Sequence, residues 1–144
     1  MDSADGPRES STVLIVEDDL KAAELLRAFL EDLPDVRTVT AADGRQAVET
    51  LSRIHPDLIL LDVMMPRMSG FEFCSRVKGD PATRDIPVVM VTALDADADY
   101  ERALQCGADD FLRKPVSRAE LITRVRSLLE LRRLRKRPPQ RPHE

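Results

Sequence analysis

The sequence lacks the features of a membrane protein or a secreted protein. No apolar run approaches the ~20 residues that are needed to cross a bilayer. The first residues, MDSADGPRESS, are acidic and polar, without the basic start and apolar stretch of a secretory signal. The two cysteines, Cys74 and Cys106, follow no spacing motif, which indicates free thiols in a reducing compartment. We therefore expect a cytoplasmic location without membrane association.

Positive charge is scarce over most of the chain. Residues 1–131 contain 16 Lys or Arg against 25 Asp or Glu, whereas residues 132–144 contain six basic residues and one acidic residue. An acidic body makes nucleic acid an unlikely partner for this chain. The basic end has three open interpretations: the end of a long helix that complements its dipole, a linker to an effector domain, or a docking segment for an acidic partner.

What the sequence does contain is typical of one globular domain. Apolar residues make up 42% and charged residues 33% of the 144 positions. We expect a disordered leader over residues 1–10, a folded domain over 11–131, and a basic, proline-rich tail or linker over 132–144.

Short apolar runs alternate with helical stripes along the chain. The runs, rich in β-branched residues, predict strands at 12–16, 36–40, 58–61, 86–91 and 110–113. Apolar residues spaced by three and four predict helices at 20–30, 47–54, 71–78 and 97–106, and from Ser117 towards Pro138. Five repeats of strand and helix predict an α/β fold with a parallel sheet and helices on both faces.

Polar residues stand out where four of these strands end. Glu17 and Asp18 follow the first run, Asp62 the third, Thr92 ends the fourth, and Lys114 follows the fifth. The carboxyl ends of parallel strands share one edge of the sheet, so these side chains should meet there. Three adjacent carboxylates favour a hard divalent cation, Mg²⁺ above all, and a lysine and a hydroxyl can take phosphoryl oxygens. This set lacks a His, Cys or Ser nucleophile with its base, and it suits a carboxylate that accepts a phosphoryl group.

Four segments together resemble a known family. They are IVEDD at 15–19, LLDVMMPRMSG at 60–70, MVTA at 90–93 and GADDFLRKP at 107–115. In order and spacing they are similar to the CheY-like receiver domain of bacterial two-component response regulators, over about residues 12–131. The resemblance implies a flavodoxin-like, doubly wound, five-stranded parallel sheet of order 2-1-3-4-5 with five helices.

The resemblance also implies a role for each matching residue. Asp62 corresponds to the phosphoacceptor. Asp18, Asp62 and the backbone carbonyl of Met64 would bind Mg²⁺ directly, and Glu17 would act through water. Glu17 replaces the commoner aspartate, so we expect a weaker or shifted Mg²⁺ affinity.

Three further residues match the part of the family pattern that responds to phosphorylation. Thr92 corresponds to the switch hydroxyl, Lys114 to the phosphate-binding lysine, and Phe111 to the aromatic switch residue. Pro115 stands where the family often has a cis peptide bond. The implied partners are a histidine kinase or phosphotransfer protein, and a downstream effector protein or fused output domain, with a possible phosphorylation-dependent dimer.

Other interpretations stay open at this point. A hydrolase of the haloacid-dehalogenase type also forms an aspartyl phosphate, but it needs a second carboxylate two residues later, where Met64 stands. A receiver-like module that is never phosphorylated would show erosion of the acidic pair, Asp62 or Lys114, and none is eroded. The domain could be a stand-alone regulator or a piece of a longer one, since 144 residues leave no room for a DNA-binding, cyclase or kinase domain as well.

Overall fold

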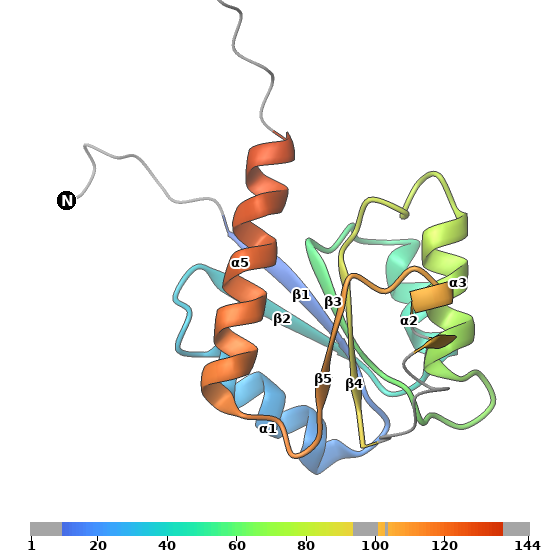
Figure 1. The fold of residues 1–144 in the computed structure, drawn as a ribbon, viewed down its shortest axis with the longest axis horizontal. Helices are drawn as coiled ribbons and strands as arrows, with labels where there is room; N and C mark the ends of the chain where they lie inside the picture. Colours follow the sequence, from blue (N-terminus) through green and yellow to red (C-terminus); the bar gives the residue numbers. More distant parts are fainter. Residues whose placement is uncertain (1–9, 94–100, 103, 137–144) are drawn as a thin grey trace, which may run out of the picture.

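Five parallel strands form one sheet in the order β2-β1-β3-β4-β5 (Figure 1). The computed structural model describes residues 10–93, 101–102 and 104–136. The strands are β1 Ser11–Val16, β2 Val36–Ala41, β3 Leu58–Asp62, β4 Val88–Thr92 and β5 Asp110–Arg113. The predicted fold class and strand order are therefore confirmed.

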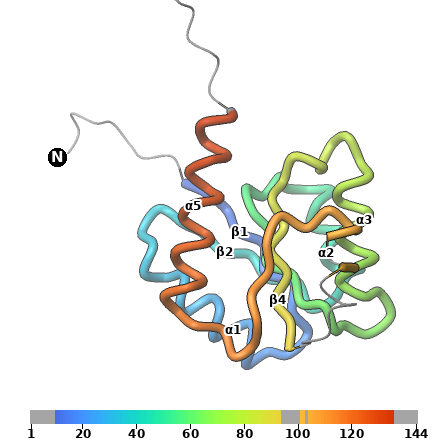
Figure 2. The backbone as a smooth tube through the Cα atoms, in the orientation of Figure 1, coloured from blue at the N-terminus to red at the C-terminus, as the bar shows by residue number. Residues whose placement is uncertain are grey.

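Helices cover both faces of the sheet (Figures 1 and 2). Helices α1 (Leu20–Leu30) and α5 (Arg118–Lys136) pack on one face, and α2 (Gly44–Leu51) and α3 (Gly70–Gly79) pack on the other. These are the four α-helices within the described residues. The expected helix at 97–106 lies partly outside them, although residues 101–102 and 104–105 are helical.

The hydrophobic core consists of two layers, one on each side of the sheet. Along β1, Val13 and Ile15 face the α1 and α5 side, whereas Leu14 and Val16 face the α2 and α3 side. Every residue of β3 and β4 is buried. Burial on both faces explains why the central strands read as continuous apolar runs and not as an alternating pattern.

Local signals at the starts of α1 and α5 agree with the expected boundaries, whereas the prediction for α2 was wrong: Asp43 caps it, and it begins and ends three residues before the expected 47–54. Asp19 caps α1 by accepting a hydrogen bond from the Lys21 amide (3.1 Å), and Ser117 accepts one from the Glu120 amide at the start of α5 (3.3 Å). Gly107 has φ of 89° at the end of the 104–105 helical turn, a conformation that suits glycine because it has no Cβ.

The predicted start of the fourth strand, at residue 86, was wrong by two residues. Strand β4 begins at Val88. Pro87 has no amide hydrogen to offer to the sheet, and the Ile86 amide donates to the Thr83 carbonyl (2.9 Å) in the preceding turn. Both residues are still buried, so the apolar run extends beyond the hydrogen-bonded strand.

Two absences expected from the sequence concern membranes and disulfides. Among the described residues, no helix combines the length and the hydrophobicity that crossing a bilayer requires. Cys74 and Cys106 are buried and form no disulfide bond. Burial raises the pKa of the Cys74 thiol far above its usual range, so this cysteine is a protonated packing residue.

Candidate functional site

The polar residues predicted to gather at one edge of the sheet lie at the carboxyl ends of neighbouring strands. Val16 pairs with Leu61, which places Glu17 beside Asp62 at the ends of β1 and β3. Asp62 pairs with Val91, and Thr92 pairs with Arg113, which precedes Lys114. This carboxyl edge is the lower edge of the sheet in Figure 1.

Three carboxylates form a cluster that could hold a metal ion. One carboxylate oxygen from each of Glu17, Asp18 and Asp62 lies within 4.8 Å of the others. Glu17 and Asp62 are 3% and 4% exposed, whereas Asp18 is exposed. A donor set made only of oxygens, buried on one side and open to solvent on the other, fits a hard divalent cation such as Mg²⁺.

Lys114 contributes the positive charge of the site. Its Nζ lies 3.2 Å from Glu17 Oε1 and 3.4 Å from Asp62 Oδ1. The Lys114 amide donates to the Thr92 carbonyl (2.8 Å), which ties the end of β5 to the end of β4. The Lys114–Pro115 peptide bond is cis, as the resemblance led us to expect.

The balance of charge at this edge is negative. Burial raises the pKa of Asp62, and the positive charge of Lys114 only partly opposes that effect. Burial also raises the pKa of Glu17, as does the negative charge of Asp62. Burial lowers the pKa of Lys114, but the negative charges of Asp62 and Glu17 raise it by more. The pKa of Lys114 therefore lies above its ordinary value. One lysine therefore does not neutralise the cluster, and the site favours a further cation.

The loop after β3 is packed tightly behind Asp62. A Cβ on Gly70 would lie 2.4 Å from the Asp62 carbonyl oxygen and 2.8 Å from Val63 Cα. The Gly70 amide donates to the Val63 carbonyl (2.9 Å), and Arg67 turns the loop with a φ of 72°. Sequence reasoning assigned Gly70 no role, although it closes the LLDVMMPRMSG motif. The close approach makes it a positioning residue for Asp62.

The remaining predicted site residues surround this cluster. The Met64 amide donates to the Asp62 carboxylate, and Met64 is 63% exposed. Thr92 is buried at the end of β4. Phe111 is partly buried against the core layer on the α2 and α3 side. The carbonyl role of Met64 and the switch roles of Thr92 and Phe111 stay predictions.

Fold and site together define a class of protein. It is a doubly wound α/β protein that gathers carboxylates and a lysine at the carboxyl edge of a parallel sheet, where such proteins bind ligands. Within this class, the chain belongs to the response regulator receiver domain family, whose model matches residues 13–126.

Curated relatives are response regulators. The response regulator PleD of Caulobacter vibrioides is 47% identical over 119 residues, which cover 83% of this chain and 26% of PleD. The phosphate regulon transcriptional regulatory protein PhoB of Escherichia coli is 41% identical over 117 residues, 81% of this chain and 51% of PhoB. The chain thus spans a quarter to a half of the length of these relatives.

Solved structures of receiver domains have the same fold. The receiver domain of a signal transduction histidine kinase from Syntrophus aciditrophicus matches with a TM-score of 0.81 and 40% identity, covering 93% of this chain and 98% of that chain. The receiver domain of the sensor histidine kinase PA1611 from Pseudomonas aeruginosa matches with a TM-score of 0.77 and 31% identity, covering 84% and 98%. That structure has a magnesium ion coordinated in its active-site cleft. The chain is therefore a signalling receiver domain of the two-component type.

Proposed function

We propose that the chain is a phosphorylation-activated switch in which Asp62 accepts a phosphoryl group from a histidine kinase or phosphotransfer protein. The observation that carries the proposal is the buried Asp62 carboxylate, beside Lys114 and within one cation-sized cluster with Glu17 and Asp18. The exposed position of Asp18 leaves the cluster open on the side from which a donor must approach.

We assign Mg²⁺ as the cation. Asp18, Asp62 and the Met64 carbonyl would bind it directly, and Glu17 would bind through water. When bound, Mg²⁺ supplies positive charge that neutralises phosphoryl oxygens during transfer. The all-oxygen donor set and the surplus negative charge support this assignment. The magnesium-containing relative supports it as well.

The transfer itself needs little more than positioning and charge. A carboxylate oxygen of Asp62 forms the new P–O bond while the P–N bond to the donor phosphohistidine breaks, and the electron pair leaves with the imidazole nitrogen. Lys114, which lies 3.4 Å from Asp62 Oδ1, pairs with one phosphoryl oxygen. The Thr92 hydroxyl donates a hydrogen bond to another. Hydrolysis by water later restores the Asp62 carboxylate and ends the signal.

The change in partner binding after phosphorylation follows from side-chain movement near β5. Thr92 turns towards the phosphoryl group, and Phe111 moves into the space that it leaves. The surface around β5 changes as a result, which alters binding to an effector protein, to a fused output domain, or to a second phosphorylated copy. We place this signalling in the cytoplasm.

Phosphorylation by a small donor tests the assignment of Asp62. The protein is incubated with acetyl phosphate and Mg²⁺, and intact mass is measured. The wild type and the control Asp32→Asn should each gain one phosphoryl group, because Asp32 is an exposed aspartate away from the cluster. Asp62→Asn should gain none. An equal gain in Asp62→Asn would reject Asp62 as the acceptor.

A further inference from the structure

A groove lies between the second half of α5 and the segment that leads into β4. Its volume is about 440 Å³, and it is lined by the apolar residues Pro87, Leu128 and Leu131, by four basic residues, among them Arg84, Arg132 and Arg135, and by two acidic residues. Pro87 directly precedes β4, so the groove opens at the amino edge of the sheet, opposite the Asp62 site. In Figure 1 this is the upper edge, where α5 ends.

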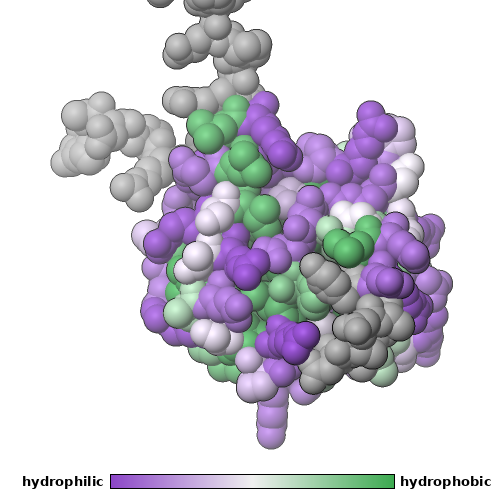
Figure 3. All heavy atoms as spheres, in the orientation of Figure 1, coloured by the Kyte–Doolittle hydropathy of each residue, from purple (hydrophilic) through white to green (hydrophobic). Residues whose placement is uncertain are grey.

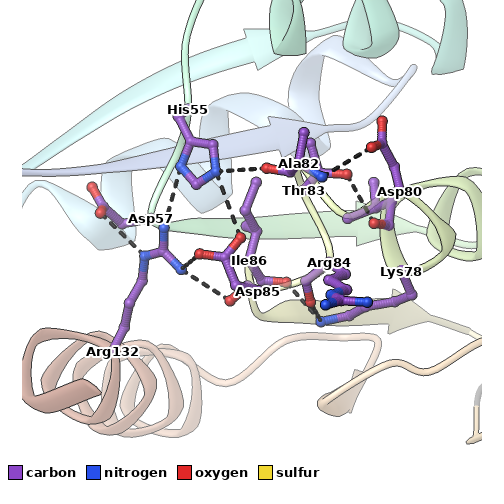
Figure 4. A network of polar contacts seen from close by, with 11 residues as sticks. His55, Asp57, Lys78, Asp80, Ala82, Thr83, Arg84, Asp85, Ile86 and Arg132 are labelled. Atoms are coloured by element: carbon purple, nitrogen blue, oxygen red, sulfur yellow. Dashed lines mark hydrogen bonds and ion pairs between the residues drawn. The ribbon is translucent and has the colours of Figure 1, made fainter. Parts of the chain in front are cut away.

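One wall of the groove is held by Arg132. Its side chain is 6% exposed and lies 3.3 Å from Asp57 Oδ1 through Nε. The Arg132 Nη1 group donates to the Asp85 carbonyl (2.9 Å) and carboxylate (3.2 Å), and Nη2 lies 3.2 Å from His55 Nδ1 (Figure 4). Arg132 is therefore fully engaged by the domain.

Lys78 fixes the other wall in the same way. Its ammonium group lies 2.8 Å from Asp109 Oδ2, and it donates to the carbonyls of Ile86 (2.7 Å) and Arg84 (3.3 Å). Figure 4 shows Lys78 reaching the 84–86 segment from α3. Both walls are thus formed before any partner binds, which lowers the entropic cost of binding.

Two guanidinium groups at the groove have no ion-pair partner among the described residues. Arg84 and Arg135 are exposed, and neither forms an ion pair with any described residue. Leu131, which also lines the groove, is 43% exposed, and Leu134 lies three residues further along α5 at 53%. Figure 3 shows hydrophobic atoms on α5 next to strongly hydrophilic ones. The groove thus joins three apolar residues to a surplus of basic over acidic residues, four against two, on a domain that is otherwise acidic.

We infer that this groove binds a short acidic and apolar segment of a partner protein. One or two large apolar side chains would enter beside Leu131, and flanking carboxylates would pair with Arg84 and Arg135. Residues 137–144 of this chain cannot supply such a segment, because they contain two arginines and one glutamate. A nucleic acid fits less well, because a phosphate backbone offers no apolar group to the exposed Leu131 at the groove.

A peptide titration tests the inference. The probe is a synthetic twelve-residue peptide with two leucines flanked by four glutamates, added to ¹⁵N-labelled protein while amide shifts are recorded. Saturable shifts should concentrate around Arg84, Leu131 and Arg135. The double variant Arg84→Glu/Arg135→Glu should bind at least roughly tenfold more weakly, because two attractive pairs become repulsive. A peptide with glutamine in place of glutamate should lose affinity by a similar factor.

Three matched controls distinguish binding in the groove from binding elsewhere on the chain. Arg126→Glu, on an exposed part of α5 outside the groove, should leave the affinity unchanged. A chain that begins at Ser10 should bind equally well, which would exclude the acidic leader as the natural occupant. Asp62→Asn should also bind equally well, so failure of the proposed phosphorylation would leave this result intact. No saturable shift, equal binding of the glutamine peptide, or stronger shifts with a DNA duplex would overturn the inference.

Discussion

The two edges of the sheet carry charged clusters that differ in how far positive charge offsets negative charge. At the carboxyl edge, three carboxylates share one ammonium group, and the pKa values of Glu17 and Asp62 are raised, mainly by burial. At the amino edge, Arg132 faces Asp57 and Asp85, and Arg133 lies 3.0 Å from Asp35. The first cluster has three carboxylates for one positive group, whereas the second has three carboxylates for two, so its charges are closer to balance.

This difference in charge suits the carboxyl edge to ligand binding and the amino edge to stabilising the fold. A buried cluster with surplus charge costs stability and persists because a ligand relieves it. A buried ion pair needs no ligand, and losing one partner leaves the other buried without compensation. Arg132 also joins α5 to the segments that precede β3 and β4. We therefore expect substitutions at the amino edge to destabilise the fold, and neutralisation at the carboxyl edge to stabilise it.

The largest expected effect is at Arg132. Arg132→Ala should lower the free energy of unfolding by about 3 kcal/mol, because the largely buried Asp57 carboxylate then loses this guanidinium partner and keeps the Thr12 amide, a neutral donor at 2.8 Å. Urea denaturation measures the loss. The control Arg126→Ala, at an exposed site on the same helix, should stay within about 0.5 kcal/mol of wild type. Equal stability of the two variants would break the proposed contrast between the edges.

The second largest effect is expected at Gly70. Close packing, and not ion pairing, holds the loop after β3 at the carboxyl edge. Gly70→Ala should destabilise by about 2 kcal/mol, since the new Cβ would lie 2.4 Å from the Asp62 carbonyl oxygen and would displace the strand end. Mg²⁺ affinity, measured by calorimetry, should fall as well. Gly79→Ala is the matched control, because nothing lies within 4 Å of its Cβ position. If both alanine variants kept wild-type Mg²⁺ affinity, Gly70 would have no positioning role.

Neutralising Asp62 should have a smaller effect of opposite sign. The raised pKa means that the folded state binds more protons than the unfolded state between the ordinary value of 3.8 and the folded value, so wild-type stability falls as pH rises through this window. Asp62→Asn removes that penalty. It should therefore be more stable than wild type by about 1 kcal/mol at neutral pH, and the difference should vanish below the ordinary aspartate pKa.

Thermal unfolding with and without Mg²⁺ checks this prediction. Mg²⁺ should raise the midpoint of the wild type more than that of Asp62→Asn, because only the wild type has the full cluster to neutralise. An Asp62→Asn variant that is less stable than wild type at neutral pH would show that the carboxylate supports the fold, and the comparison of the edges would fail.

The carboxyl edge could be predicted from sequence for a physical reason. Buried parallel strands read as continuous apolar runs, and the first polar residue after each run falls at the shared edge. Glu17, Asp62 and Thr92 were located in this way. The start of β4 was less predictable, since Ile86 and Pro87 are as apolar as the strand itself but cannot both join its hydrogen bonds.

The amino edge could not be predicted in the same way. His55, Asp57 and Asp85 come from connecting segments with no periodic pattern, and Arg132 opens a basic stretch that reads as solvated. Their meeting depends on the length and direction of α5, which are three-dimensional quantities. A signal does exist in hindsight: Arg132 lies three residues after Leu129, on the helical stripe that packs against the sheet.

The smallest expected effect is at the ion pair between Arg124 and Asp110. This pair tests whether the burial of an ion pair, and not only its presence, explains the large effect expected for Arg132→Ala. Arg124 Nη1 lies 2.5 Å from Asp110 Oδ2, but the arginine side chain is 42% exposed. Arg124→Ala should therefore cost only about 0.5 kcal/mol, and the cost should shrink in 1 M salt, where exposed charges are screened over roughly 3 Å. The cost of Arg132→Ala should change less between low and high salt, because Arg132 is 6% exposed and its partner Asp57 is 22% exposed, so this pair is largely shielded from solvent. Denaturation of both variants at two salt concentrations makes the comparison. If the two arginines responded alike to salt, their different burial would not account for their different contributions.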